Sequence, residues 1–383
     1  ESVDTVAPSI FRKKCDNGSD IKAAWGDLEG ATCVDHGLQL CADAFLTHAG
    51  VKEVVRCMNG ITAHFSRSAL ATQTLYNIQK DLGLPLSMPN TKASTRWLGQ
   101  FPQAVWFVHN ADAIRKYDDI FPDDCASNPD GTKYGDHAID ETGWKVIRQM
   151  TGVLWPVAQI VAELQGQKSV TVSLVLPFLG HLVAVLDSSQ PVRYQDERGD
   201  TSVVNMEACE LETCVASARD ALREAIVKRF FVDVEDSDLE DVGIATFLDP
   251  RFKLLDFVFP EHHLFHVGKF RRRIRSAVRR EWSKDWKLPG KKGEDEGPPL
   301  KKHATERLMT KATSGVHAIL CGSLSSDCAG AGEVDAWDEL EDYRDVPQET
   351  NKDVDPLAWW SKRRVQFPTL SKMARQFLAG PAT

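Results

Sequence analysis

The sequence predicts an α/β fold in which helices predominate. In two segments, apolar residues recur every three or four positions, which places them on one face of a helix. Only one run, residues 9–15, has the character of a buried strand, and the turn-forming Asp16-Asn17-Gly18 ends it. The predicted sheet is therefore small, and most of the chain is expected to be helical.

The two helical segments are well defined by their apolar stripes. Residues 51–68 carry Val51, Val54, Val55, Met58, Ile61 and Phe65. Residues 211–226 carry Leu211, Val215, Ala218, Leu222, Ala225 and Ile226, and this helix is expected to continue to Phe230. Stretches rich in Gly, Pro and Asp predict loops over residues 122–141, 187–202, 288–303 and 321–333.

Length and composition exclude several classes of protein. With 383 residues, 42% hydrophobic and 26% charged, the chain is expected to form two or three globular domains. A net charge of -9 argues against a protein that coats nucleic acid over its whole surface, although it permits a local basic face. Nine cysteines without a Cys-x-x-Cys pair are typical of reduced thiols in the nucleus or cytoplasm. No stretch approaches the roughly 18 consecutive apolar residues of a membrane span.

A strongly basic segment covers residues 269–280. Its cations are Lys269, Arg271, Arg272, Arg273, Arg275, Arg279 and Arg280. A solvated helix face is the simpler interpretation, and a strip that binds DNA phosphates is the alternative.

Three short motifs carry candidate chemistry. Asp16 follows a predicted strand, which is where α/β folds place reactive groups. Cys33 and His36 lack a second ligand pair at zinc-finger spacing, so a buried structural pair is the simpler interpretation. Arg96 and Trp97 form a pair that can bind phosphate and stack on an unpaired base, although core packing with a surface charge is more common.

Taken in order, these fragments resemble the hAT superfamily of DNA transposases, in the branch related to BED-zinc-finger host proteins. The matching series is Asp16-Asn17-Gly18-Ser19-Asp20, Cys33-Val34-Asp35-His36, His64-Phe65-Ser66-Arg67-Ser68, Thr95-Arg96-Trp97, Leu248-Asp249-Pro250-Arg251-Phe252-Lys253, Asp355-Pro356-Leu357-Ala358-Trp359-Trp360 and Phe367-Pro368. The resemblance implies an RNase H-like core, here incomplete, that is interrupted by a large all-helical insertion. We therefore expect a partial RNase H-like domain over residues 1–48, the helical insertion over 49–334 and a truncated C-terminal dimerisation region over 335–383.

The resemblance also implies a catalytic mechanism and its gaps. In the family, three acids hold two divalent metal ions that activate water, and later a DNA 3′-hydroxyl, for attack on phosphodiester bonds. Asp16 matches the second acid and would be a metal ligand in an active protein. The first Asp and the final Glu are absent from this sequence, and the spacing of Asp20, Asp35 and Asp43 does not indicate that they replace them.

The resemblance assigns DNA contacts to His36, Arg96 and Trp97, while the BED-type zinc finger has no match here. We expect a hAT transposase-derived protein that is catalytically inactive, self-associates and retains some DNA binding through these residues and Arg271, Arg272 and Arg273. Neither a cofactor nor a small-molecule substrate is expected. The alternative is a fragment of an active cut-and-paste transposase that uses Mg²⁺ or Mn²⁺. The nucleus is the expected location, with the cytoplasm as the alternative.

The last expectation concerns the C-terminal aromatic residues. Adjacent tryptophans are typical anchors of interfaces, so we expect residues 339–383 to pack against a partner. The residues proposed for this contact are Leu357, Trp359, Trp360, Phe367 and Leu370. The alternative is that the same rings pack on the helical domain of their own chain.

Overall fold

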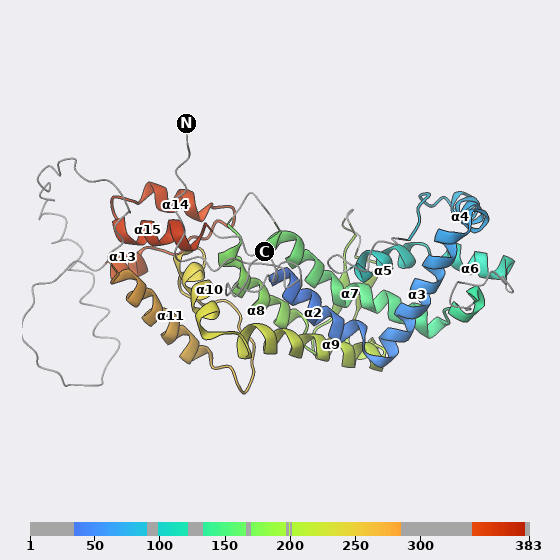
Figure 1. Ribbon diagram of the computed structural model, residues 1–383, viewed down its shortest axis with the longest axis horizontal. Coiled ribbons are helices and arrows are strands. Elements are labelled where there is room, and N and C mark those ends of the chain that lie inside the picture. Colours follow the sequence, from blue (N-terminus) through green and yellow to red (C-terminus); the bar gives the residue numbers. More distant parts are fainter. Residues whose placement is uncertain are drawn as a thin grey trace, which may run out of the picture.

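The computed structural model describes residues 34–89, 99–121, 133–165, 170–196, 199, 201–284 and 339–379. These residues form an elongated array of helices with one small hairpin (Figure 1). The α-helices are α2 (Val34–Leu46), α3 (Ala49–Arg67), α4 (Ala69–Asp81), α5 (Gln100–His109), α6 (Ala111–Ile120), α7 (Glu141–Leu164), α8 (Val175–Val185), α9 (Thr213–Val227), α10 (Asp236–Leu248), α11 (Val267–Trp282), α13 (Glu339–Asp345), α14 (Pro356–Lys362) and α15 (Pro368–Phe377). Shorter helical turns are η1 (Tyr134–His137), η2 (Val172–Leu174), η3 (Ala208–Glu210) and η4 (Lys228–Val232). The predominantly helical character predicted from sequence is confirmed, whereas the predicted strand at residues 9–15 lies outside the described residues and the RNase H-like core stays a prediction.

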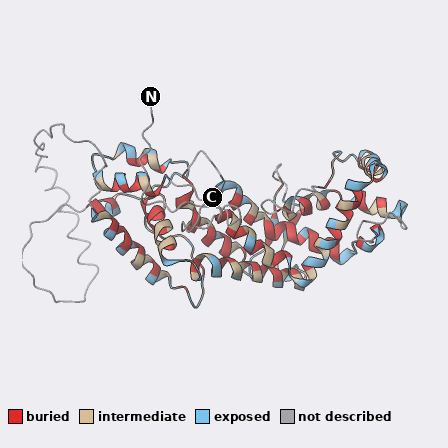
Figure 2. Ribbon diagram, viewed as in Figure 1, coloured by how far each residue is buried: buried red, intermediate tan, exposed pale blue. Residues whose placement is uncertain are grey.

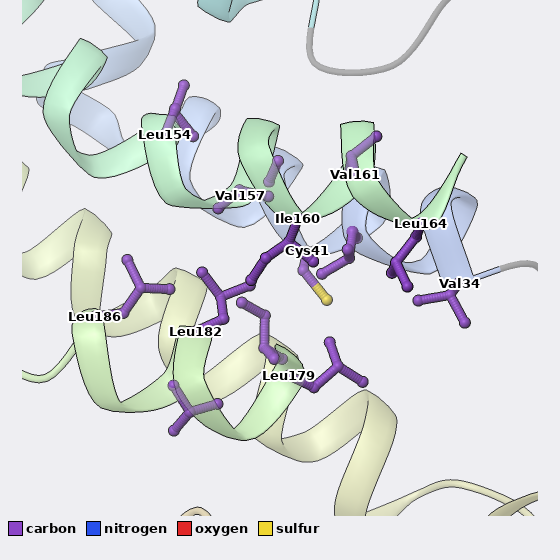
Figure 3. Packing of buried hydrophobic residues seen from close by; sticks show 14 of the residues in the cluster. Val34, Cys41, Leu154, Val157, Ile160, Val161, Leu164, Leu179, Leu182 and Leu186 are labelled. Atoms are coloured by element: carbon purple, nitrogen blue, oxygen red, sulfur yellow. The ribbon is translucent and has the colours of Figure 1, made fainter. Parts of the chain in front are cut away.

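Helix α7 is the central element. It is 24 residues long, and the carboxylate of its N-cap residue Asp140 accepts a hydrogen bond from the backbone N–H of Gly143 at 2.7 Å. Apolar side chains of α7 meet those of α8 and α2 in the core. Figure 3 shows this packing through Val34, Cys41, Leu154, Val157, Ile160, Val161, Leu164, Leu179, Leu182 and Leu186.

A two-stranded antiparallel hairpin lies on α7. Strand β1 (Val192–Tyr194) pairs with β2 (Val204–Met206) in the register Val192↔Met206 and Tyr194↔Val204. A Cβ atom at Gly152 of α7 would lie 2.2 Å from the Cγ1 atom of Val192, so only glycine lets the hairpin approach this closely. The predicted loop over residues 187–202 therefore contains a strand that the sequence analysis did not identify.

Both helices predicted from apolar stripes are present. The segment 51–68 corresponds to α3, and the segment 211–226 to α9, which ends at Val227 and continues as the π-helical turn η4. Helix α2 packs on α9 and α7. The last part of the predicted first domain, residues 34–48, thus shares its core with the helical region.

The molecule has two ends joined by α7, α8 and α9 (Figure 1). One end contains α3, α4, α5 and α6, and the other contains α10, α11 and the C-terminal helices α13, α14 and α15. Figure 2 shows buried residues running along the interior of the whole array. None of the described helices combines the length and the apolar character that crossing a membrane requires.

Candidate dimerisation and nucleic-acid interface

The three C-terminal helices dock on α10 and α11 through aromatic rings. Trp360 is fully buried, and its indole N–H donates to the backbone carbonyl of Leu248 at the end of α10 over 2.6 Å. The ring of Tyr343 lies 4.8 Å from that of Trp360. Burial raises the pKa of Tyr343 well above its ordinary value, so its hydroxyl stays protonated and donates to the carbonyl of Phe247.

The segment after α10, residues 249–253, is the polar part of this junction. The buried carboxylate of Asp249 accepts hydrogen bonds from the hydroxyl of Ser173 at 2.6 Å and from the guanidinium of Arg251 at 2.7 and 2.9 Å. Arg251 also donates to the carbonyl of Lys352, and the N–H of Glu349 donates to the carbonyl of Pro250 at 2.9 Å. Asp249 and Arg251 thus connect the helical region to the C-terminal segment.

Lys253 completes the junction at the carboxyl end of α13. Its ammonium donates to the carbonyls of Tyr343 at 2.6 Å, Arg344 at 3.2 Å and Val346. Burial lowers the pKa of Lys253 to about 8, so the group is still mostly protonated at neutral pH. A cation at this end is favourable because the last carbonyls of a helix lack partners within the helix.

Glu339 makes the complementary contact at the start of α15. Its buried carboxylate accepts from the backbone N–H groups of Thr369 at 3.0 Å and Leu370 at 2.8 Å. A carboxylate satisfies the unpaired N–H groups at a helix N-terminus and is attracted by the helix dipole there. Helices α13 and α15 are therefore held together as one unit.

The roles of Glu339 and Lys253 were not predicted from the sequence, which contains only part of the signal for them. Lys253 and Asp249 lie in a motif used for the resemblance, but the sequence does not show which carbonyls or hydroxyls they meet. Glu339 lies in no motif that would have predicted its contact with α15.

The residues predicted to contact a partner lie mostly inside their own chain. Trp360, Phe367 and Leu370 are fully buried, Trp359 is 6% exposed, and Leu357 is half-buried. The structure thus shows the intrachain packing that the sequence analysis left open as the alternative. A partner that meets the folded C-terminal region has to contact other side chains.

The basic helix α11 divides its cations between two roles. The guanidinium of Arg271 donates to the carbonyl of Leu255 at 2.8 Å and lies over the ring of Phe259. Arg273 is ion-paired with Asp236 and Glu240 of α10. Two of the three predicted DNA-binding arginines therefore make hydrogen bonds or ion pairs within their own chain.

Three other cations of α11 are exposed and form no ion pair among the described residues, unlike Arg280, which pairs with Glu240. Arg272 is exposed, and within the described part of the chain it hydrogen-bonds only with the carbonyl of Gly268 on its own helix. Lys269 and Arg275 are also exposed, and each lies three residues from Arg272 and so next to it on the helix surface. We call Lys269, Arg272 and Arg275 the α11 basic stripe.

The candidate N-terminal site is only partly described. Asp16, Asp20, Arg96 and Trp97 lie outside the described residues. His36 is half-buried on α2, and Asp43 of the same helix is also half-buried. Across the described ranges, no three His, Cys, Asp or Glu side chains lie close enough together to hold a metal ion.

Asp35, in the first turn of α2, is the unusual acid of this region. Its side chain is 1% exposed, and its Oδ1 atom has no hydrogen-bond partner among the described residues. Burial raises the pKa of Asp35 to about 6, an effect partly opposed by a hydrogen bond with Gln165. It lies alone rather than in a group of acids.

Comparison with known proteins places the C-terminal helices in a family. Residues 339–383 match the hAT family C-terminal dimerisation region. The chain is 23% identical, over 96% of its length, to zinc finger BED domain-containing protein 6 of Mus musculus, and equally identical to the Homo sapiens protein of that name. Over 37% of the chain it is 27% identical to the zinc finger BED domain-containing protein RICESLEEPER 3 of Oryza sativa subsp. japonica.

The chain spans 35% of the length of the mouse and human relatives and 18% of the rice relative. The similarity to the mammalian proteins covers both ends of the described array, whereas the family match covers α13, α14 and α15. The segment that matches an hAT-family dimerisation region thus contains the helices that close over α10 and α11, and nearly the whole chain is similar to zinc finger BED domain-containing proteins.

Proposed function

We propose that this chain is a catalytically inactive, hAT transposase-derived protein of the nucleus that self-associates through its C-terminal region and binds DNA weakly without sequence preference. The observation that carries the proposal is the match of residues 339–383 to a dimerisation region, in a segment whose helices pack and hydrogen-bond on α10 and the residues that follow it. The polar junction positions this segment, and the buried rings stabilise it.

The α11 basic stripe supports the DNA contact. Lys269, Arg272 and Arg275 project from one face, and no acidic side chain of the described ranges pairs with them. Cations that neutralise phosphates release counterions from DNA, which gives binding that weakens steeply with salt and ignores sequence. Arg271 and Arg273 instead support the stripe by fixing α11 on its neighbours.

We expect residues 1–383 by themselves to lack strand-cleavage activity, because too few of the family's metal-binding acids have a match among them. Asp16 alone corresponds to the family's three metal-binding acids, and a two-metal site needs several carboxylates that converge on both ions. We therefore expect no nicking of supercoiled plasmid by residues 1–383 with Mg²⁺ or Mn²⁺. Metal-dependent nicking that disappears in Asp16→Ala would contradict this and support the fragment of an active transposase.

Self-association is tested by sedimentation of residues 1–383 over a wide range of protein concentration. The proposal expects reversible, concentration-dependent formation of a dimer or larger assembly. A monomer at every concentration would refute it.

A further inference from the structure

The charges of the C-terminal region are divided along its sequence. Residues 339–355 contain seven acidic and two basic residues, a formal charge of −5. Residues 356–379 contain five basic residues and no acid, a formal charge of +5. We call these segments the acidic half and the basic half.

The basic half is not neutralised within the chain. Lys362, Arg364, Lys372 and Arg375 are exposed, and in the part of the chain that the structure describes none of them forms an ion pair. Arg363 is half-buried, because its guanidinium lies 3.9 Å from the centre of the Trp359 ring. By contrast, Arg251, Arg273 and Arg280 each pair with a carboxylate.

The acidic half also presents free charge. Glu341 on α13 and Asp353 before α14 are exposed and have no side-chain partner among the described residues. Glu339 differs because its carboxylate is buried against the N-terminus of α15. That contact joins the acidic half to the start of α15 in the basic half, whereas Lys253 joins the other end of α13 to the segment after α10.

The apolar anchors of this region are used inside the chain. Because Trp360, Phe367 and Leu370 are fully buried, a partner meets mainly charged side chains. Val365, which is 76% exposed beside Arg364, offers one apolar contact on the basic half. Figure 2 shows exposed stretches along the outer sides of α14 and α15.

We infer that the acidic half of one copy lies on the basic half of a second copy, and that this charge complementarity selects the dimer. An isologous two-fold interface brings the same patch of both subunits together, so equal and opposite halves form two sets of attractive contacts. The inference rests on the self-association proposed above and identifies the surface that performs it.

A second copy fits this surface better than a nucleic acid does. A polyanion would be attracted by the basic half but repelled by the acidic half beside it, whereas another copy satisfies both. The family match of residues 339–383 to a dimerisation region points to the same occupant. Exposed ion pairs are individually weak and are screened by salt, so the dimer should weaken as ionic strength rises.

The experiment uses charge reversal in the full chain. The basic-half variant is Lys372→Glu/Arg375→Glu, and the acidic-half variant is Glu341→Lys/Asp353→Lys. The matched control, Lys52→Glu/Lys80→Glu, reverses two exposed lysines on α3 and α4 at the other end of the molecule. Sedimentation equilibrium at about 0.1 M and about 0.5 M salt measures the dissociation constant, and circular dichroism verifies folding.

Each half-reversed variant should raise the dissociation constant about tenfold or more at low salt, while the control variant leaves it unchanged. An equimolar mixture of the two half-reversed variants should restore a dimer near wild-type affinity, because each presents the charge that the other lost. Misfolded variants would not recover in this way.

Two results would overturn the inference. If the wild type dimerises and both variants dimerise equally well, self-association stands but a different surface performs it. If the basic-half variant loses affinity for duplex DNA while its self-association is unchanged, the basic half is a nucleic-acid surface. A wild type that stays monomeric would refute the proposed function itself.

Discussion

Asp35 shows how burial changes the behaviour of one acid. Its pKa is about 6 in the folded chain and about 3.8 when exposed in the unfolded chain. The folded state therefore binds the proton more tightly. The stability that this proton confers is full below pH 3.8 and is lost as the pH rises through about 6.

The variant Asp35→Asn removes this titration. At pH 7 we expect it to stabilise the fold by at most about 3 kcal/mol, because a shift of one pKa unit corresponds to about 1.4 kcal/mol. Near pH 4 the variant and the wild type should differ little. Urea unfolding midpoints at pH 4, 5, 6 and 7 measure the effect. If the unfolding midpoint changed with pH in the same way in both proteins, Asp35 would not titrate between pH 4 and pH 7.

Lys253 provides a second prediction for a single residue. In Lys253→Met the side-chain volume is nearly kept, but three carbonyls at the end of α13 lose their donor. Buried acceptors without partners cost about 1–3 kcal/mol each, so the free energy of unfolding should fall by about 2 kcal/mol or more. Lys352→Met, at an exposed position, is the control and should change stability by less than about 0.5 kcal/mol. Similar urea midpoints for the two variants would contradict the role of Lys253.

Helix α11 carries both the cations that we propose to bind DNA and the cations that contact neighbouring parts of the fold. The triple variant Lys269→Ala/Arg272→Ala/Arg275→Ala should lower the slope of log affinity against log salt by about 2–3, since each phosphate contact contributes about 0.9. Its stability should change little because these side chains are exposed. Fluorescence anisotropy with two unrelated duplexes measures affinity, and both duplexes should give the same values.

The pair Arg271→Ala/Arg273→Ala is the matched comparison on the same helix. It removes the hydrogen bond to Leu255 and the ion pairs with α10, so it should lower the unfolding midpoint. Its salt slope should fall less than that of the triple variant. The reverse order of the two slopes would show that the inner arginines, and not the stripe, contact DNA.

At the same scale, the sequence predicted elements better than it predicted their contacts. The stripe from Val51 to Phe65 was sufficient to identify α3, because a period of three to four over many residues has few alternatives. The hairpin was missed because each strand has three residues, too few to show alternation. The ion pairs of Arg273 join positions more than thirty residues apart, which no local pattern reveals.

The C-terminal rings illustrate the same limit. Their apolar character predicted that Trp359 and Trp360 would be buried, but burial against α10 and burial against a partner satisfy the same hydrophobic requirement. Only the position of α10 decides between them. The predicted catalytic position, Asp16, remains a prediction because it lies outside the described residues.

Because the molecule is elongated, we expect a destabilising substitution at one end to leave the other end folded. Among the described elements, α2, α7, α8 and α9 lie between the end formed by α10, α11, α13, α14 and α15 and the end formed by α3, α4, α5 and α6 (Figure 1). Such contiguous groups of elements often open as separate cooperative units.

Trp360→Ala tests this organisation, because it removes a fully buried ring and the hydrogen bond to Leu248 at the C-terminal end. The expected cost is about 3–5 kcal/mol, as for other buried aromatic side chains. Hydrogen exchange measured by mass spectrometry should show faster exchange in α10, α11, α13, α14 and α15, and unchanged exchange in α3 to α6. A control, Trp359→Phe, keeps an aromatic ring beside Arg363 and should preserve most of the protection at both ends. Equal acceleration over the whole chain in Trp360→Ala would mean that the array opens as one cooperative unit, and the C-terminal region would then be essential for the fold of the distant end as well.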